Sequence, residues 1–142
     1  MREITSHRVN PANDKLTIQV RDEPGAGGAC HLYRVAGFNP VANPSFTSVE
    51  GSHARFSLEG ERAEYYCDIM FQNGPIAEYG INGLTQEVLL AIVVDRLQSF
   101  QAGAFACREN AVALTHLETA QLWLHKRTLD RMARGVEGTS QL

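Results

Sequence analysis

Apolar residues occupy every second position in several short runs of the first half of the chain. A period of two places successive side chains on opposite faces of a β-strand. The runs cover residues 16–20, 33–35, 56–58 and 65–71. Clusters of Gly, Pro, Asn and Asp separate these runs, at 13–14, 22–28, 39–40, 43–44 and 73–75. The pattern predicts an antiparallel, meander-like sheet of about four to six strands.

After Gly83 the apolar spacing changes to that of a helix. Thr85 is a suitable N-cap, and Leu84 and Leu89 are placed to form a hydrophobic staple across it. We therefore expect a first helix from Gln86 to about Gln101. Its middle is apolar on nearly every side, so we expect this helix to be buried between layers.

Gly103 ends that helix, and a second one is expected from about Phe105 to Arg134, with Gly135 in the C′ position. A helix of about 30 residues is ~45 Å long. It extends beyond a sheet this small, and such an overhanging helix usually pairs with a second copy. The predicted fold is α+β, a single domain of residues 1–142. It has an antiparallel sheet in 1–83 and a two-helix hairpin in 84–138, packed as a homodimer. We expect the tail 138–142 to be frayed.

One stripe of the second helix has the 4-3-4-3-4-3-4 spacing of a heptad seam, which faces a partner helix. The seam consists of Ala106, Asn110, Ala113, Leu117, Ala120, Leu124, Arg127 and Arg131. Its middle is small and apolar, whereas its ends are polar. Polar groups on a buried seam are costly unless something satisfies them. The arginines indicate that the missing partner is an anionic ligand.

Arg127 and Arg131 lie one turn apart, with Cβ atoms ~5–6 Å from each other. Two guanidinium groups at that spacing can grip a phosphate or a diphosphate. Lys126 and Arg134 add positive charge nearby. A second interpretation stays open, because cations in the last turn of a helix also complement its dipole.

Asn110 lies 17 residues before Arg127, or ~25 Å along the helix axis, so one ligand cannot touch both within one chain. Antiparallel pairing of two helices would bring Asn110 of one copy to Arg127 and Arg131 of the other. Phe100 lies near the Asn110 end, where its ring could stack on a base. The alternatives are that Asn110 sets the register of helix pairing and that Phe100 belongs to the core.

Composition narrows the class of protein. The chain of 142 residues is long enough for a core, and its net charge of −3 argues against nucleic acid as a partner. No apolar run reaches the ~18 residues of a membrane span. The N-terminal residues have no signal-peptide core, so a cytoplasmic protein without membrane contact is expected.

The sequence shows no catalytic device. Its three cysteines form no C-x-x-C pair, and its five histidines have no metal-ligand spacing. Neither a Ser-His-Asp order nor a G-x-S-x-G elbow is present. The glycine-rich stretch 22–28 leads into a strand rather than a helix, which favours a hairpin loop over a phosphate loop. We therefore predict a binding protein with no catalytic residue, no metal and no cofactor.

Several segments occur in a familiar order. The centre of the chain contains Phe71-Gln-Asn-Gly-Pro-Ile76, Gly80-Ile-Asn-Gly-Leu84 and Asp95-Arg-Leu-Gln98, and the C-terminal half contains Phe105-Ala-Cys-Arg-Glu-Asn110, Trp123-Leu124 and Arg134-Gly-Val-Glu-Gly138. This order resembles the Thoeris anti-defence protein 1 family of small phage-encoded sponges. The hairpin is similar in arrangement to that of anti-CBASS protein 2, a cyclic-oligonucleotide sponge. Ala104 stands where the family pattern has proline.

The resemblance implies a homodimer, which in some members forms a hexamer as a trimer of dimers. It implies that the protein binds glyco-cyclic ADP-ribose in the cytoplasm of the infected bacterium without cleaving it. Some relatives also bind cyclic di- or trinucleotides at separate sites. The implied ligand contacts are Phe100, Asn110, Arg127 and Arg131. The ring and one arginine sandwich the adenine, and the other groups hold phosphate and ribose. An oligomeric structural module and a signal-degrading enzyme are the alternatives.

Overall fold

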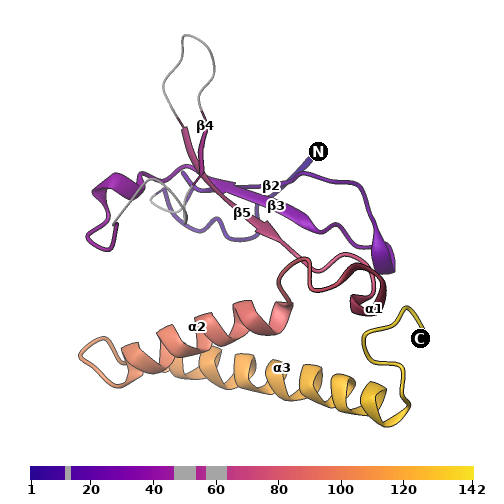
Figure 1. Ribbon diagram of the computed structural model, residues 1–142. Coiled ribbons are helices and arrows are strands. Elements are labelled where there is room, and N and C mark those ends of the chain that lie inside the picture. Colours follow the sequence, from indigo (N-terminus) through magenta and orange to yellow (C-terminus); the bar gives the residue numbers. More distant parts are fainter. Residues whose placement is uncertain (12–13, 47–53, 57–63) are drawn as a thin grey trace. The chain divides into compact units, whose positions relative to one another are not determined.

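The computed structural model describes residues 1–11, 14–46, 54–56 and 64–142 (Figure 1). The chain divides into two units, Met1–Asn73 and Gly74–Leu142. The described strands lie in the first unit and the three α-helices in the second. This order confirms the predicted α+β class with the sheet first. The assignment of both halves to a single domain stays a prediction.

The described residues of the first unit form five strands in a fully antiparallel sheet of order β1-β2-β3-β5-β4. They are β1 (Arg2–Ile4), β2 (Thr17–Val20), β3 (Leu32–Ala36), β4 (Ala54–Phe56) and β5 (Glu64–Met70). The strands β2, β3 and β5 coincide with predicted alternating runs, whereas β4 shares only Phe56 with its predicted run. Leu58, which the prediction included in the third run, and Asn13, in the first turn, lie outside the described residues.

Register separates the two faces of the sheet. Ile18 pairs with Val35, which pairs with Cys67 on the far side, so apolar residues line one face. Val20, at 2% exposure, is the most buried apolar residue of the described chain. On the other face, Arg34 donates to both carboxylate oxygens of Asp68, at 2.8 and 2.9 Å. This fixed pair raises the pKa of Arg34 above its ordinary value.

The loop between β2 and β3 is a hairpin loop, as predicted, and contains the short 3-10 turn Ala26–Gly28. The carboxylate of Asp22 accepts hydrogen bonds from the backbone N–H groups of His31 (2.9 Å) and Leu32 (3.1 Å). These bonds to the charged form lower the pKa of Asp22. Gly27 has a φ of +71°, which a residue with a Cβ rarely adopts. A carboxylate therefore anchors the entry to β3.

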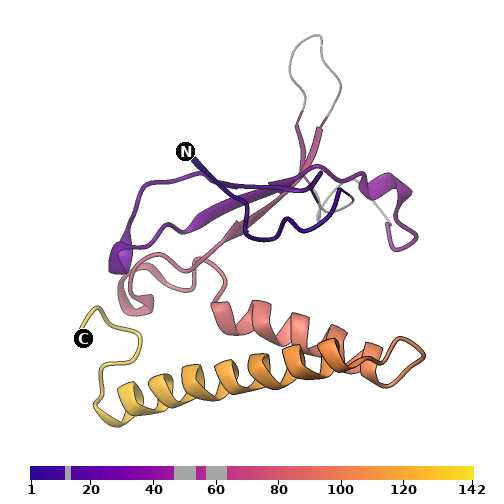
Figure 2. The same cartoon turned by 180° about the vertical axis from the view of Figure 1, so that it is seen from behind.

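The second unit contains α1 (Ile76–Tyr79), α2 (Gln86–Gln101) and α3 (Arg108–Ala133). The bounds of α2 are those predicted, and the hydroxyl of Thr85 caps it by accepting from the Val88 N–H at 3.3 Å. α2 and α3 pack against each other as an antiparallel hairpin, visible from both sides (Figures 1 and 2).

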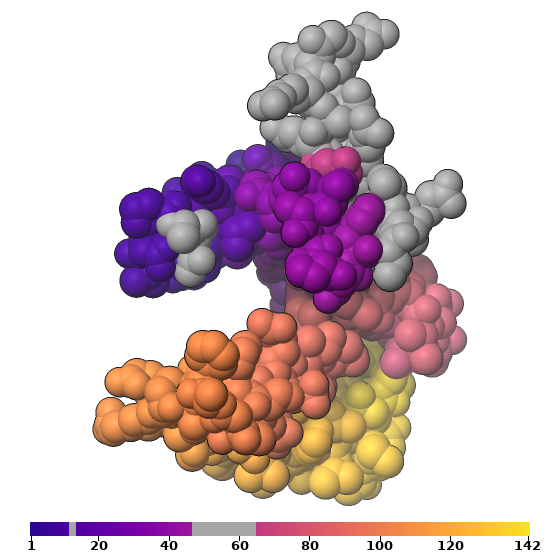
Figure 3. Space-filling view, turned by 90° about the vertical axis from the view of Figure 1, so that its left-hand side faces the viewer, coloured from indigo at the N-terminus to yellow at the C-terminus, as the bar shows by residue number. Residues whose placement is uncertain are grey.

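α3 begins three residues later than predicted. Its N-cap is Cys107, whose sulfur accepts from the Asn110 N–H at 3.4 Å, and whose own N–H donates to Gln101 at 3.0 Å. The connection before it, orange in Figure 3, projects from the end of the hairpin, and Phe105 within it is 77% exposed. The helix ends as expected, with Gly135 at a φ of +72° closing the last turn.

The expected burial of α2 is wrong for the single chain. Ile92 is 55% exposed, Val88 and Val93 are also exposed, and only Val94 counts as buried on this fully described helix. The physical reason is that a hairpin of two helices covers one side of each helix and leaves the other open. Within the hairpin, α3 therefore leaves the other apolar face of α2 uncovered.

Candidate functional site

The four predicted ligand residues do not come together within one chain. Phe100 stands in the last turn of α2 and Asn110 in the first turn of α3, both next to the connection of the hairpin. Arg127 and Arg131 stand in the last two turns of α3, ~25 Å away along the axis. The structure thus places an aromatic-amide pair at one end of the hairpin and a cationic pair at the other.

The predicted seam is only partly covered. Asn110, Leu117 and Leu124 lie on the less exposed side of α3, whereas Ala113 and Arg127 are exposed. The less exposed side of α3 consists of Asn110, Leu114, Leu117, Ala120, Gln121, Leu124, Thr128 and Arg131. Because α2 packs against α3, part of the seam is used inside the chain. The seam positions that stay exposed are small residues and Arg127.

A hollow of about 660 Å³ lies at the C-terminal end of α3. Its lining residues are Trp123, Lys126, Arg127, Asp130, Arg131, Arg134 and Leu142. Lys126 and Asp130 form an ion pair at 2.7 Å, one turn apart and both exposed. Within the described residues, the Arg127 guanidinium has no hydrogen-bond or ion-pair partner. The hollow therefore has excess positive charge, and Arg127 is available to an anion.

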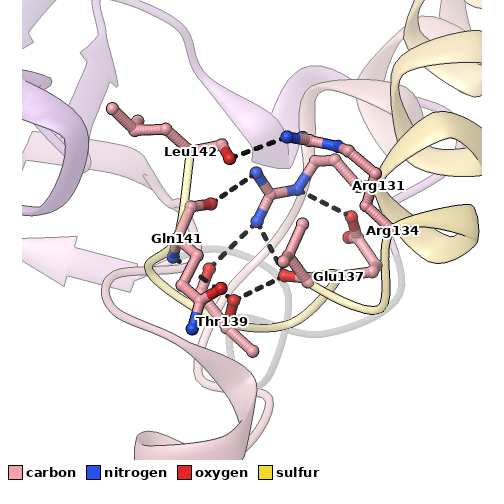
Figure 4. Close-up of polar contacts among 7 residues, drawn as sticks. Arg131, Arg134, Glu137, Thr139, Gln141 and Leu142 are labelled. Carbon is pink, nitrogen blue, oxygen red and sulfur yellow. Dashed lines mark hydrogen bonds and ion pairs between the residues drawn. The ribbon is translucent and has the colours of Figure 1, made fainter.

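Arg131 is held by the segment that follows its own helix. Its side chain is 11% exposed and donates four hydrogen bonds to described residues (Figure 4). The acceptors are the Glu137 carboxylate (3.0 Å) and the carbonyl oxygens of Gln141 (2.8 Å), Val136 (2.9 Å) and Thr139 (3.1 Å). Arg134 donates to the main-chain oxygen of Leu142 at 2.8 Å. The expectation of a frayed tail is therefore wrong, because two arginines order it.

The other end of the hairpin carries Phe100 and Asn110. Phe100 is 38% exposed, and the Arg96 guanidinium carbon lies 5.5 Å from its ring centroid, within cation–π range. Asn110 is partly covered, and its backbone N–H is taken by the Cys107 sulfur. An aromatic face beside a cation suits a nucleobase, which stacks on both.

Sequence reasoning missed Trp123 as a lining residue of the hollow. The indole of Trp123 is 67% exposed. It lies on the same helix face as Arg127, which follows Trp123 by four residues. That i, i+4 spacing was a usable signal, because such side chains are neighbours on a helix surface. It also missed the tail, whose path after Gly135 has no periodic pattern.

Among the described residues, no group of three or more His, Cys, Asp or Glu side chains could hold a metal ion. None of the helices in this part of the chain has the length and apolar character needed to cross a membrane.

Two comparisons with known proteins agree. The model of the Acb2/Tad1 hairpin domain matches residues 64–129, a range that includes Phe100, Asn110 and Arg127 and stops before Arg131 and the tail. The chain is also 35% identical over 141 residues to Thoeris anti-defense 1 of Bacillus phage SBSphiJ7, with 99% of both proteins covered.

Proposed function

Because this chain belongs to the Thoeris anti-defence 1 family, we propose that it is a phage sponge for a cyclic nucleotide immune signal. The proposed ligand is glyco-cyclic ADP-ribose, with cyclic di- and trinucleotides as further candidates. The protein binds the signal without cleaving it, in the cytoplasm of the infected bacterium. Sequestration works by mass action, so the protein must hold the signal tightly. A nanomolar Kd corresponds to about −12 kcal/mol.

The observation that carries this proposal is the cationic hollow at the end of α3. Arg127 and Arg131 stand one turn apart there, and the guanidinium of Arg127 has no partner within the described residues. A diphosphate presents several acceptor oxygens, and two guanidinium groups can bind it with charge-assisted, bidentate hydrogen bonds. The exposed Trp123 ring adds an apolar wall for a base or ribose.

The complete site is proposed to need two copies. Phe100 and Asn110 of one copy would face Arg127 and Arg131 of the other across an antiparallel helix pair, which gives two equivalent sites per homodimer. Ala113 and Arg127 of the predicted seam are exposed on α3, so a second helix has access to that part of the stripe. Native mass spectrometry would separate a dimer from a hexamer.

Calorimetry with glyco-cyclic ADP-ribose tests the site. Arg127→Ala should weaken binding by about 100-fold, because it removes charge-assisted hydrogen bonds to phosphate. Arg2→Ala in β1 removes the same charge from an exposed position outside the hollow and is the matched control. Unchanged affinity in the Arg127 variant would remove Arg127 from the site.

Heat release of the bound ligand tests the sponge mechanism. A sponge returns the intact signal after denaturation, whereas a signal-degrading enzyme returns products. An oligomeric structural module would show no shift of its melting temperature when any of these nucleotides is added. Either of those two results would refute the proposed function.

A further inference from the structure

The C-terminal tail, residues 136–142, offers Arg131 the kind of oxygen atoms that an anionic ligand would offer. A guanidinium has five N–H donors. Among the described residues, Arg131 uses four of its donors in hydrogen bonds to the tail. The bonds involve Nε, Nη1 and Nη2, so each edge of the planar group has at least one donor in use. A phosphate gripped bidentately needs two parallel donors on one edge. The tail and such a ligand therefore exclude each other at Arg131.

We propose that the tail is an intramolecular occupant of the Arg131 site and that the anionic ligand displaces it. This inference rests on the proposed function and adds a step to it. In the free protein the tail satisfies a guanidinium that would otherwise be partly desolvated and unpaired. Three of its four acceptors are neutral carbonyl oxygens, which bind a guanidinium more weakly than phosphate does. The exchange of the tail for the ligand at Arg131 is therefore favourable. Because the tail must first leave, it nevertheless lowers the apparent affinity of the protein for the ligand.

One side chain braces the tail without contacting Arg131. The Thr139 hydroxyl donates to the Val136 carbonyl at 2.6 Å and accepts from the Gln141 N–H at 3.3 Å. It thereby holds together the turn that presents three carbonyl oxygens to the guanidinium. Thr139→Ala removes this brace without changing any charge. Glu137→Gln instead removes the carboxylate on Nε.

The experiment measures the Kd of the full chain for glyco-cyclic ADP-ribose by calorimetry. Apparent affinity scales with the fraction of molecules whose site is open, so a looser tail gives tighter binding. Thr139→Ala should bind about threefold tighter, and Glu137→Gln combined with Thr139→Ala about tenfold tighter. Ser140→Ala is the matched control and should stay within about twofold, because Ser140 is an exposed neighbour whose side chain has no hydrogen-bond partner among the described residues. Because Thr139→Ala alters no charge, its effect cannot arise from electrostatics alone.

Trimming by carboxypeptidase, followed by mass spectrometry, reads the tail directly. Thr139→Ala should be trimmed faster than the unmodified chain, and saturating ligand should speed up trimming of the unmodified chain. Faster trimming of Thr139→Ala with unchanged or weaker binding would overturn the proposal. So would a ligand that protects the tail, because the tail would then close over the site. If neither protein binds any of the cyclic nucleotides, the proposed function fails as well, which distinguishes the two failures.

Discussion

The sheet and the helical hairpin satisfy their charged groups in different ways. In the sheet, Arg34 is paired with both oxygens of Asp68 on the neighbouring strand, and its guanidinium carbon lies 3.7 Å from the centroid of the Tyr66 ring. In the hairpin, Arg131 is satisfied mainly by carbonyl oxygens of a terminal segment. The first set of partners is fixed by strand register, whereas the second can leave. The difference separates an arginine that stabilises the fold from one that is suited to exchange partners.

Removal of Arg131 tests whether the hairpin arginine, unlike Arg34, binds the ligand. Arg131→Ala should lower the affinity for glyco-cyclic ADP-ribose by about 100-fold, because it removes charge-assisted contacts to phosphate. Arg34→Ala, which deletes a guanidinium held by Asp68 in the sheet, should leave that affinity within about twofold. Calorimetry on both variants measures the contrast. Equal losses in the two variants would mean that the hairpin arginine has no special role.

The second prediction reverses the contrast by measuring stability. Arg34→Ala should reduce the free energy of unfolding by about 1–3 kcal/mol, since it leaves the Asp68 carboxylate partly covered and unpaired. Arg131→Ala should cost less, because the released tail carbonyls become hydrated. Urea unfolding at one fixed protein concentration provides the comparison, as self-association changes apparent stability. A more destabilising Arg131→Ala would make the tail a structural element.

The third prediction concerns the weakly held start of α3. A thiol is a poor hydrogen-bond acceptor, and Ser is among the preferred N-cap residues. Cys107→Ser should therefore stabilise the protein by about 0.5–1 kcal/mol without affecting ligand binding directly. The melting temperature measures this gain. A loss of stability would show that the Cys107 sulfur contributes through packing rather than through capping.

The smallest expected effect concerns pH and the anchor of the β2–β3 loop. Folding lowers the pKa of Asp22, chiefly through the hydrogen bond from the His31 N–H. Its contribution to stability is therefore fully present above the unfolded-state value of about 3.9 and is lost as pH falls through the lower folded-state value. Asp22→Asn should make the urea unfolding midpoint less dependent on pH in this acidic range. If the midpoint of the variant still falls as steeply with pH, other carboxyl groups cause the loss of stability.

The elements that followed from the sequence are those with strong local signals. α2 was predicted to the residue because Thr85 starts it, Gly103 follows it, and the residues between are helical in pattern. The strands β2, β3 and β5 were found through alternation, whereas β4 was met only at Phe56. β1 was missed because Arg2-Glu3-Ile4 contains one apolar residue, and α1 because four residues between glycines carry no period.

The candidate site was predictable only in part. The spacing of Arg127 and Arg131 on one helix follows from a period of 3.6, and so does their separation from Asn110. The same period also places Trp123 beside Arg127. Trp123 was not predicted because it lies on the stripe next to the heptad seam and not on the seam itself. Whether two copies join the two ends of the hairpin stays a prediction.

Four properties follow from the sequence alone: the order of sheet and helices, the bounds of α2, the end of α3 at Gly135 and the cationic face of its last turns. These properties depend on residues close together in the chain, whose side chains repeat at fixed intervals. The three-dimensional fold is needed to show that the tail turns back onto Arg131 and that α3 leaves the middle of α2 uncovered. The position of the tail depends on the path of the chain after a glycine, and the exposure of α2 depends on which surfaces meet. Neither property produces a periodic pattern in the sequence.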